Sequence, residues 1–290
     1  MPIELVIPTL ETGCFFGLIA LALFMVKESA ALFNFAVGGL VVVGGMAGSS
    51  IAVEHGLPLV LGVLVAVVIG VALGLCIEAL VVAPLVKPGK GEDHHVVMAL
   101  VAGLFALQQI AGVAFGKSAL PGATWVKGDV LELGKFVVSA QALVEIVVTV
   151  GLFVAIGLLL RRTKLGRQFR SIGDNTQAAT MLGMPVRRIR LLAFASSGLI
   201  AGLAGVLFAN RAGIAFTSAL QFTLFGFLSF VIGGAANVWG PLAGGLGLAI
   251  MQAAAIYYFG PAALAYMTFG VAVLFFALRP EGIFVKRVRA

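Results

Sequence analysis

Residues 58–82 read PLVLGVLVAVVIGVALGLCIEALVV and hold a single charged residue, Glu78. A helix needs about 20 apolar residues to cross the roughly 30 Å hydrocarbon core of a bilayer, so this stretch is long enough. Lipid offers backbone amides no hydrogen-bond partner, and the sequence lacks the alternating pattern of a membrane β-barrel. The stretch therefore predicts a membrane-spanning helix.

The rest of the chain has the same character, with 61% hydrophobic and 11% charged residues and a mean hydropathy of +1.14. Soluble domains carry about 25% charged residues, so the composition predicts an integral membrane protein. We expect an all-α, polytopic helical bundle of eight or nine spans, forming one transmembrane domain over residues 1–290. The predicted spans are 10–26, 30–53, 58–82, 96–115, 136–160, 191–209, 220–235, 240–259 and 262–278. Span 220–235 is short and ends in two glycines, so a re-entrant or broken helix stays an alternative to a full crossing.

Charge predicts the orientation of the bundle. Residues 161–190 carry eight basic side chains against one acidic side chain. Basic loop residues remain on the cytoplasmic side of a membrane, which places this loop inside the cell. Only Lys117, Lys127, Lys135 and Arg211, of the 19 basic residues, then lie outside. Nine spans give an external N-terminus and a cytoplasmic C-terminus, and basic residues that flank spans do not indicate nucleic-acid binding.

The basic loop also contains the signals of a short helix. Asp174 or Asn175 is a suitable N-cap, Gly183 a suitable C′ residue, and Pro185 prevents continuation. Four apolar residues are predicted to share one face of this two-turn helix: Ala178, Ala179, Met181 and Leu182. So short a helix is marginal alone and must dock on something. Two docking surfaces are compatible with this helix: anionic lipid headgroups, and a groove on a cytoplasmic protein.

Few polar residues lie within the spans, where they are costly unless they face protein or water. Glu78 and Glu145 lie near the ends of their spans, where snorkelling or helix–helix hydrogen bonding explains them at least as well as a transport role, and Glu78 is taken as a structural polar residue. The candidates for lining a solute pathway are Asn34, Gln108, Gln109, Thr223 and Gln252. A pathway lined this sparsely suits a small, largely apolar solute.

Enzymatic and metal-binding patterns are not found in the sequence. Cys14 and Cys76 lie within spans, and the histidines show no metal-ligand spacing. We therefore expect no catalytic residue, no metal and no cofactor on this chain. The 38 glycines instead favour close helix packing within the bundle. Pairs at four-residue spacing are Gly13/Gly17, Gly44/Gly48, Gly70/Gly74, Gly112/Gly116, Gly198/Gly202 and Gly240/Gly244.

Several motifs occur in the order found in a known family. They are FNFAVG (33–38), Glu78 with Pro84, TKLGR (163–167), GDNTQAATMLGMPVRR (173–188), the glycine-rich stretch 232–245 and RPEGIF (279–284). In these motifs the chain resembles the permease subunits of branched-chain amino acid ABC transporters, of the LivH/LivM type. One departure is Val37, which stands where the family commonly has histidine.

The resemblance implies an importer in a bacterial cytoplasmic (inner) membrane. Its other parts are a second permease subunit, identical or different, two cytoplasmic ATPases that bind ATP and Mg²⁺, and an external solute-binding protein. The expected solute is a branched-chain or other hydrophobic amino acid, with urea or a short amide as the alternative and a stand-alone secondary carrier or channel as the less favoured one. On the resemblance, the residues that couple the chain to the ATPase are Gly166, Gly173, Asp174, Asn175, Ala178, Ala179, Met181, Leu182 and Gly183.

Overall fold

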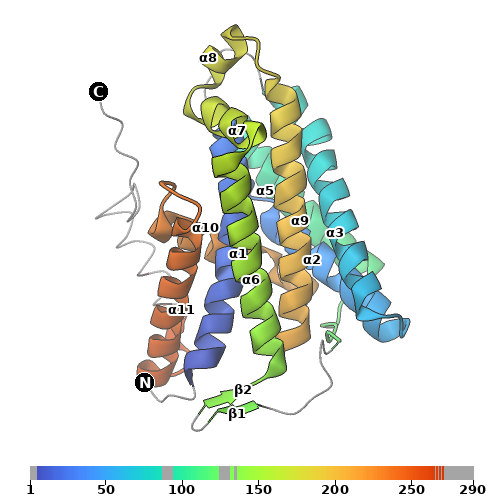
Figure 1. The fold of residues 1–290 in the computed structure, drawn as a ribbon. Helices are drawn as coiled ribbons and strands as arrows, with labels where there is room; N and C mark the ends of the chain where they lie inside the picture. The colour runs from blue at the N-terminus through green and yellow to red at the C-terminus, as the bar shows by residue number, and fades with distance from the viewer. Residues whose placement is uncertain are drawn as a thin grey trace. The chain divides into compact units, whose positions relative to one another are not determined.

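The computed structural model describes residues 5–86, 94–123, 131–133, 136–264, 266, 268 and 270. Within these residues, eight helices are long and apolar enough to cross a membrane (Figure 1). The elements are α1 (Val6–Ala30), α2 (Val37–Ser49), η2 (Ser50–Glu54), α3 (Leu59–Cys76), η3 (Ile77–Val82), α4 (Ala83–Leu85), α5 (His94–Ala114), β1 (Leu131–Leu133), β2 (Phe136–Val138), α6 (Ala140–Arg162), α7 (Lys164–Asp174), α8 (Thr176–Met181), α9 (Val186–Ala212), η4 (Phe216–Ser218), α10 (Ala219–Gly233) and α11 (Gly240–Phe259). The predicted all-α polytopic bundle is confirmed. Most of predicted span 262–278 lies outside the described residues, and the orientation of the termini stays a prediction.

The chain divides into two compact units. The first unit comprises the described parts of residues 1–21, 125–153 and 225–290, and the second comprises those of 22–124 and 154–224. The boundaries between the units fall within α1, α6 and α10. The basic loop and the Glu78 region therefore belong to the second unit.

The core of the second unit is a close contact of α2 and α3 with α9 (Figure 1). Added Cβ atoms at Gly70 and Gly44 would overlap backbone atoms of Gly198 and Gly202, respectively. Small residues let helix backbones approach this closely and gain dispersion contacts that lipid does not supply. The prediction that these glycine pairs pack helices within the bundle is confirmed.

In the first unit, the start of α1 packs on α11 through glycines. A Cβ added to Gly13 or Gly17 would overlap Leu246 or press on Leu242 of α11, respectively. On another side of α11, Gly244 lies against the backbone of Ser229 in α10. The glycines predicted at 13/17 and 240/244 therefore also serve packing.

Two predicted span boundaries are wrong for local reasons. Predicted span 30–53 begins too early, because residues 31–36 are not helical and α2 starts at Val37. Asn34 ends that irregular segment: its Oδ1 accepts a hydrogen bond from the amide of Ala36 at 3.2 Å. Predicted span 136–160 also begins too early, since residues 136–138 form β2, paired antiparallel with β1. Ser139 Oγ accepts from the amide of Ala142 and starts α6.

The seventh span is short, as the sequence predicts. The 3₁₀ turn η4 and α10 together make an 18-residue apolar candidate span, residues 216–233. The α-helical part, α10, has 15 residues, and it rises only about 22 Å at 1.5 Å per residue. This length is less than the hydrocarbon core of a typical bilayer, so the re-entrant alternative stays open.

Candidate coupling face and buried polar residues

The loop of residues 161–190 contains a helix that the sequence analysis did not predict. α7 begins directly after α6, because Thr163 Oγ1 accepts a hydrogen bond from the amide of Gly166 at 3.1 Å and caps the new helix. Phe169 and Ile172 are buried on one side of α7, and Arg167 is exposed on the other. The three-residue spacing of Gly166, Phe169 and Ile172 is a signal that the dense basic residues obscured.

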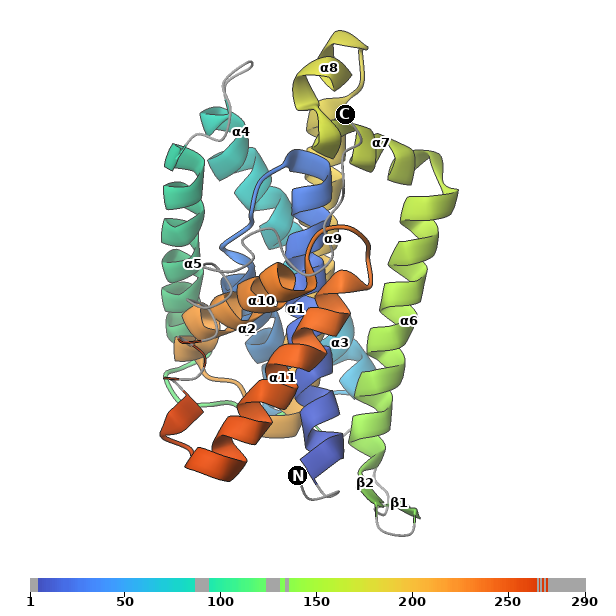
Figure 2. The same cartoon turned by 90° about the vertical axis from the view of Figure 1, so that its left-hand side faces the viewer.

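α7 runs across the end of α6 (Figure 2) and is held there by two glycines. A Cβ added to Gly166 would overlap the backbone of Leu160, and one added to Gly173 would overlap the carbonyl oxygen of Glu28. These two candidate coupling residues therefore act through packing. They fix α7 against the ends of α6 and α1.

α8 has the bounds and caps that the sequence predicts. The Oδ1 atom of Asn175 accepts a hydrogen bond from the amide of Ala178 at 2.9 Å, which satisfies an otherwise free donor of the first turn. Asp174, the alternative N-cap, is instead the last residue of α7. Gly183 adopts φ 73°, a left-handed conformation that favours glycine, and Pro185 follows. The short helix is confirmed, with Asn175 as its N-cap.

The apolar residues of α8 do not share one face, and that prediction is wrong. Ala179 is only 2% exposed and points into the protein, whereas Met181 is 88% and Leu182 76% exposed. Ala178 is exposed as well. The reason is that contact with the rest of the second unit selects which side of so short a helix turns inward. What remains outward is a patch of Ala178, Met181 and Leu182, here called the α8 apolar patch.

The connection from α8 to α9 is short and hydrogen-bonded. The amide of Met184 donates to the carbonyl of Ala179 at 3.0 Å, and the amide of Ile189 donates to that of Pro185 at 3.1 Å. α8 and α9 lie next to each other at the same end of the second unit (Figures 1 and 2). Only Gly183, Met184 and Pro185 lie between Leu182 and the first residue of α9.

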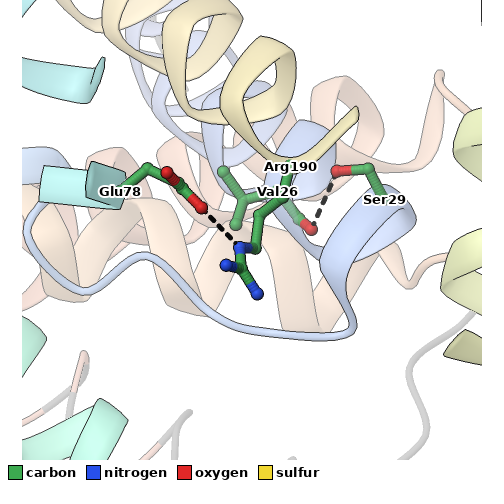
Figure 3. A network of polar contacts seen from close by, with 4 residues as sticks. All are labelled: Val26, Ser29, Glu78 and Arg190. Atoms are coloured by element: carbon green, nitrogen blue, oxygen red, sulfur yellow. Dashed lines mark hydrogen bonds and ion pairs between the residues drawn. The ribbon is translucent and has the colours of Figure 1, made fainter. Parts of the chain in front are cut away.

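A buried ion pair lies close to this connection, and the sequence analysis missed it. The Nε atom of Arg190, in α9, donates to Oε1 of Glu78, in η3, at 2.6 Å (Figure 3). Glu78 is 0% and Arg190 9% exposed. Charge counting places Arg190 among the basic residues of the loop and does not indicate its buried partner. The predicted structural role of Glu78 in helix–helix bonding agrees with this contact.

Asn34 and Thr223 meet at the start of α2. Thr223 Oγ1 accepts from the amide of Gly38 at 3.0 Å, and Asn34 Nδ2 donates to Ser197 Oγ at 3.4 Å. Both candidate pathway residues are almost completely buried and make hydrogen bonds within the protein. In this conformation they cap α2 and hold it to α9 and α10.

The three glutamines predicted to line a pathway lie on α5 and α11. On α5, Gln109 is exposed and Gln108 half-buried. Gln252, in the first unit, is 7% exposed and donates from Nε2 to Thr268 Oγ1 at 3.4 Å. A pathway role for these side chains stays a prediction. Among the residues that the structure describes, no cluster of three or more His, Cys, Asp or Glu side chains is arranged to hold a metal ion.

Comparison with known proteins gives matches along nearly the whole chain. The sequence profile of the family described as "Branched-chain amino acid transport system / permease component" matches residues 6–278. LivH of Escherichia coli (strain K12), a high-affinity branched-chain amino acid transport system permease protein, is 26% identical; the match covers 93% of this chain and 91% of LivH. LsrC of Yersinia enterocolitica, an autoinducer 2 import system permease protein, is 34% identical over 163 residues, which are 52% of this chain and 44% of LsrC. The match with LsrC therefore spans less than half of that relative.

A solved structure shares the fold. The structure described as PsaBC from Streptococcus pneumoniae in complex with Fab contains a chain that aligns with a TM-score of 0.53 and 16% sequence identity. The alignment covers 94% of this chain and 91% of that one. At this level of identity the likeness concerns the fold alone.

Proposed function

Because this chain belongs to the family of branched-chain amino acid transport permease components, we propose that it is the membrane-spanning permease subunit of an ATP-driven importer. In this proposal α8 docks on a cytoplasmic ATPase, and nucleotide-driven movement of that ATPase opens the bundle alternately to either side of the membrane. The chain hydrolyses no ATP itself. The assembly contains a second permease subunit, two ATPases and an external solute-binding protein, in a bacterial inner membrane.

The α8 apolar patch is the observation that carries this proposal. Met181 and Leu182 are large apolar side chains that are mostly exposed on a helix of only six residues. Burying each in a partner's groove would contribute about 1.5–3 kcal/mol. Ala179 packs inward and anchors the helix, so Met181 and Leu182 are presented at the end of the second unit.

The solute that we propose is a branched-chain or other hydrophobic amino acid. The similarity to LivH along most of both chains favours this class, and the scarcity of polar residues in the spans agrees with a largely apolar solute. LsrC is named for the import of a different solute, so the family comparison alone does not select the solute. Urea or a short amide is the alternative within the same mechanism.

The test is a reconstitution. The chain is co-expressed with candidate ATPases, a second permease and a binding protein, and ATP hydrolysis in proteoliposomes is measured against a panel of amino acids, urea and short amides. We expect leucine, isoleucine or valine to stimulate hydrolysis and to be taken up with ATP as the only energy source. Uptake by the chain alone, driven by a proton or sodium gradient, would instead identify a secondary carrier and overturn the proposal.

A further inference from the structure

The helices α3 and α9 run antiparallel in a regular register. Residues that face each other recur every fourth position on both helices, which is the spacing of one row along a helix surface. The facing pairs are Ala66/Gly202, Gly70/Gly198, Gly74/Phe194 and Glu78/Arg190. The Glu78–Arg190 ion pair is therefore the fourth step of a continuous row of contacts.

The first three steps differ from the fourth in what makes the contact. Added Cβ atoms at Gly202, Gly70 and Gly74 would overlap carbonyl oxygens of the facing helix, so the backbones themselves touch there. Such a contact has no side-chain rotamers to adjust, which makes it rigid. At the fourth step two long side chains bridge the helices, and α3 gives way to the π-helix η3 at Ile77. Short π-helical segments occur frequently at functional sites.

The ion pair uses only part of its bonding capacity. Arg190 Nε donates to Oε1 of Glu78, whereas Oε2 of Glu78 is buried without a hydrogen-bond partner in the described part of the chain. A bidentate arginine–carboxylate pair is stronger and has a more fixed geometry. The second oxygen lets the guanidinium slide along the carboxylate without losing the pair. This step of the row can therefore change geometry while it stays connected.

The location of the pair connects it to α8. Arg190 lies in the second turn of α9, and the hydrogen bond from the amide of Met184 to the carbonyl of Ala179 ties α8 to the residues that lead into the first turn of α9. On the other side, Glu78 belongs to η3, the end of the third span beyond the last glycine contact. The ion pair thus connects the start of α9, which is the part nearest α8, with η3. The backbone contacts between α3 and α9 do not extend to η3.

We propose that Glu78 and Arg190 are positioning residues that carry movement of α8 into the η3 end of the third span. The proposal rests on the proposed function, in which an ATPase moves α8. While α8 pulls on the first turns of α9, the ion pair makes η3 follow them. Without the pair, these turns move alone, and ATP is hydrolysed without equivalent transport of solute.

The test measures solute molecules transported per ATP hydrolysed by the complete reconstituted transporter. In the double variant Glu78→Met/Arg190→Met both charges are removed together, because replacing a buried ion pair by apolar side chains of similar size is often neutral for stability. We expect this variant to assemble and hydrolyse ATP, with the ratio lowered about tenfold, within the range typical of coupling between sites. The exchanged variant Glu78→Arg/Arg190→Glu restores the pair and should recover most of the ratio.

Ser29→Ala is the matched control. Ser29 is also buried close to the pair, but its hydroxyl donates within α1, to the carbonyl oxygens of Met25 at 2.8 Å and Val26 at 3.3 Å (Figure 3). It connects no two helices, so its loss should leave the ratio unchanged.

A wild-type ratio in the double methionine variant would overturn the inference, as would failure of the exchanged variant to recover when it is assembled. If neither variant assembles, Arg190→Lys decides. It keeps the charge and a donor, so the inference requires a ratio of solute transported to ATP hydrolysed close to that of wild type, and a ratio lowered about tenfold in an assembled Arg190→Lys variant would refute it. Solute-stimulated ATP hydrolysis by the wild-type complex is measured first, before any variant is compared. Its absence would defeat the proposed function itself, which keeps that failure distinct from a failure of the present inference.

Discussion

The α8 apolar patch and the contact between α3 and α9 lie close together in the sequence, because α9 begins directly after the α8 loop, yet the two surfaces are of opposite kinds. In α8, the large side chains of Met181 and Leu182 point outward and touch little. In the α3–α9 contact, glycines such as Gly70 and Gly198 bring two backbones together and leave no space. The first surface is incomplete without a partner, and the second is complete within the chain. Substitutions in the α3–α9 contact should therefore act on folding, and substitutions in the α8 apolar patch should act on transport.

The largest effect is expected where the backbones touch. Gly198→Val places side-chain atoms on the carbonyl of Gly70, a collision with main chain that no rotamer relieves. We expect the free energy of unfolding to fall by at least about 1–3 kcal/mol, since overpacking a well-packed site costs this much or more. Little monodisperse protein should then be obtained. Fluorescence-detected size-exclusion chromatography and thermal unfolding in detergent measure it.

The control for this substitution is Gly157→Ala in α6, where nothing lies within 4 Å of an added Cβ. Alanine there should be neutral or stabilise the helix by up to about 1 kcal/mol. A Gly198→Val protein with the yield and thermal midpoint of wild type would show that α3 and α9 do not pack through their backbones.

A large effect on function, without an effect on folding, is expected at the α8 apolar patch. Leu182→Arg removes an exposed apolar side chain, so the isolated chain should keep its thermal midpoint. If a groove on the ATPase buries this residue, the loss of about 1.5–3 kcal/mol lowers solute-stimulated ATP hydrolysis by tenfold or more at limiting ATPase. The measurement is hydrolysis as a function of ATPase concentration.

Thr180→Arg adds the same charge on an exposed residue about 160° around an ideal helix from Leu182. If a groove on the ATPase receives the α8 apolar patch, Leu182→Arg should lower ATP hydrolysis and Thr180→Arg should not. If both leave hydrolysis unchanged, α8 rests on anionic headgroups instead, which the sequence analysis kept as an alternative.

How far the sequence predicts this end of the molecule depends on the range of the interactions. The caps of α8 are local: Asn175 bonds the amide of a residue three positions away, and Gly183 needs no neighbour to adopt φ 73°. These features were read correctly from the residues alone. The positions of the eight apolar spans in the described part of the chain were also predicted, apart from the starts of two of them, because length and hydrophobicity identify such spans.

Longer-range contacts were not predictable in the same way. Arg190 pairs with Glu78, which is 112 positions away in the sequence, so counting the charges of the loop does not indicate this partner. Ala179 turns inward because tertiary contacts orient α8, whereas periodicity gives only relative positions of residues on a helix. Asn34 was read as a pathway residue from its polarity and its depth in a span. Its hydrogen bond to Ser197 depends on the packing of α9, which no local pattern encodes.

A smaller effect is expected from removing the cap of α8. Asn175→Ala loses the hydrogen bond to the Ala178 amide and should cost the helix about 1 kcal/mol, a change of about fivefold in its population. Solute-stimulated hydrolysis should fall by a similar factor, and the amides of residues 176–181 should exchange hydrogen faster. Asn175→Asp keeps a capping oxygen and should behave as wild type. Slower transport with unchanged exchange would separate Asn175 from the stability of α8.

The smallest effect is expected on α5, at Gln109. Its side chain is exposed on this chain, beside apolar residues such as Ile110 and Val113 that are 56% and 86% exposed. An exposed side chain without a structural contact changes stability by about 0.5 kcal/mol or less, so Gln109→Leu should leave uptake within about twofold of wild type.

Gln108→Leu is the internal comparison, because the Oε1 atom of Gln108 is buried without a hydrogen-bond partner among the described residues. Removing a buried unsatisfied group should be neutral or slightly stabilising. A larger loss of uptake at Gln109 than at Gln108, with both proteins folded, would mean that the exposed face of α5 meets solute or a second permease subunit. That face would then be, like α8, a surface that only the assembled transporter completes.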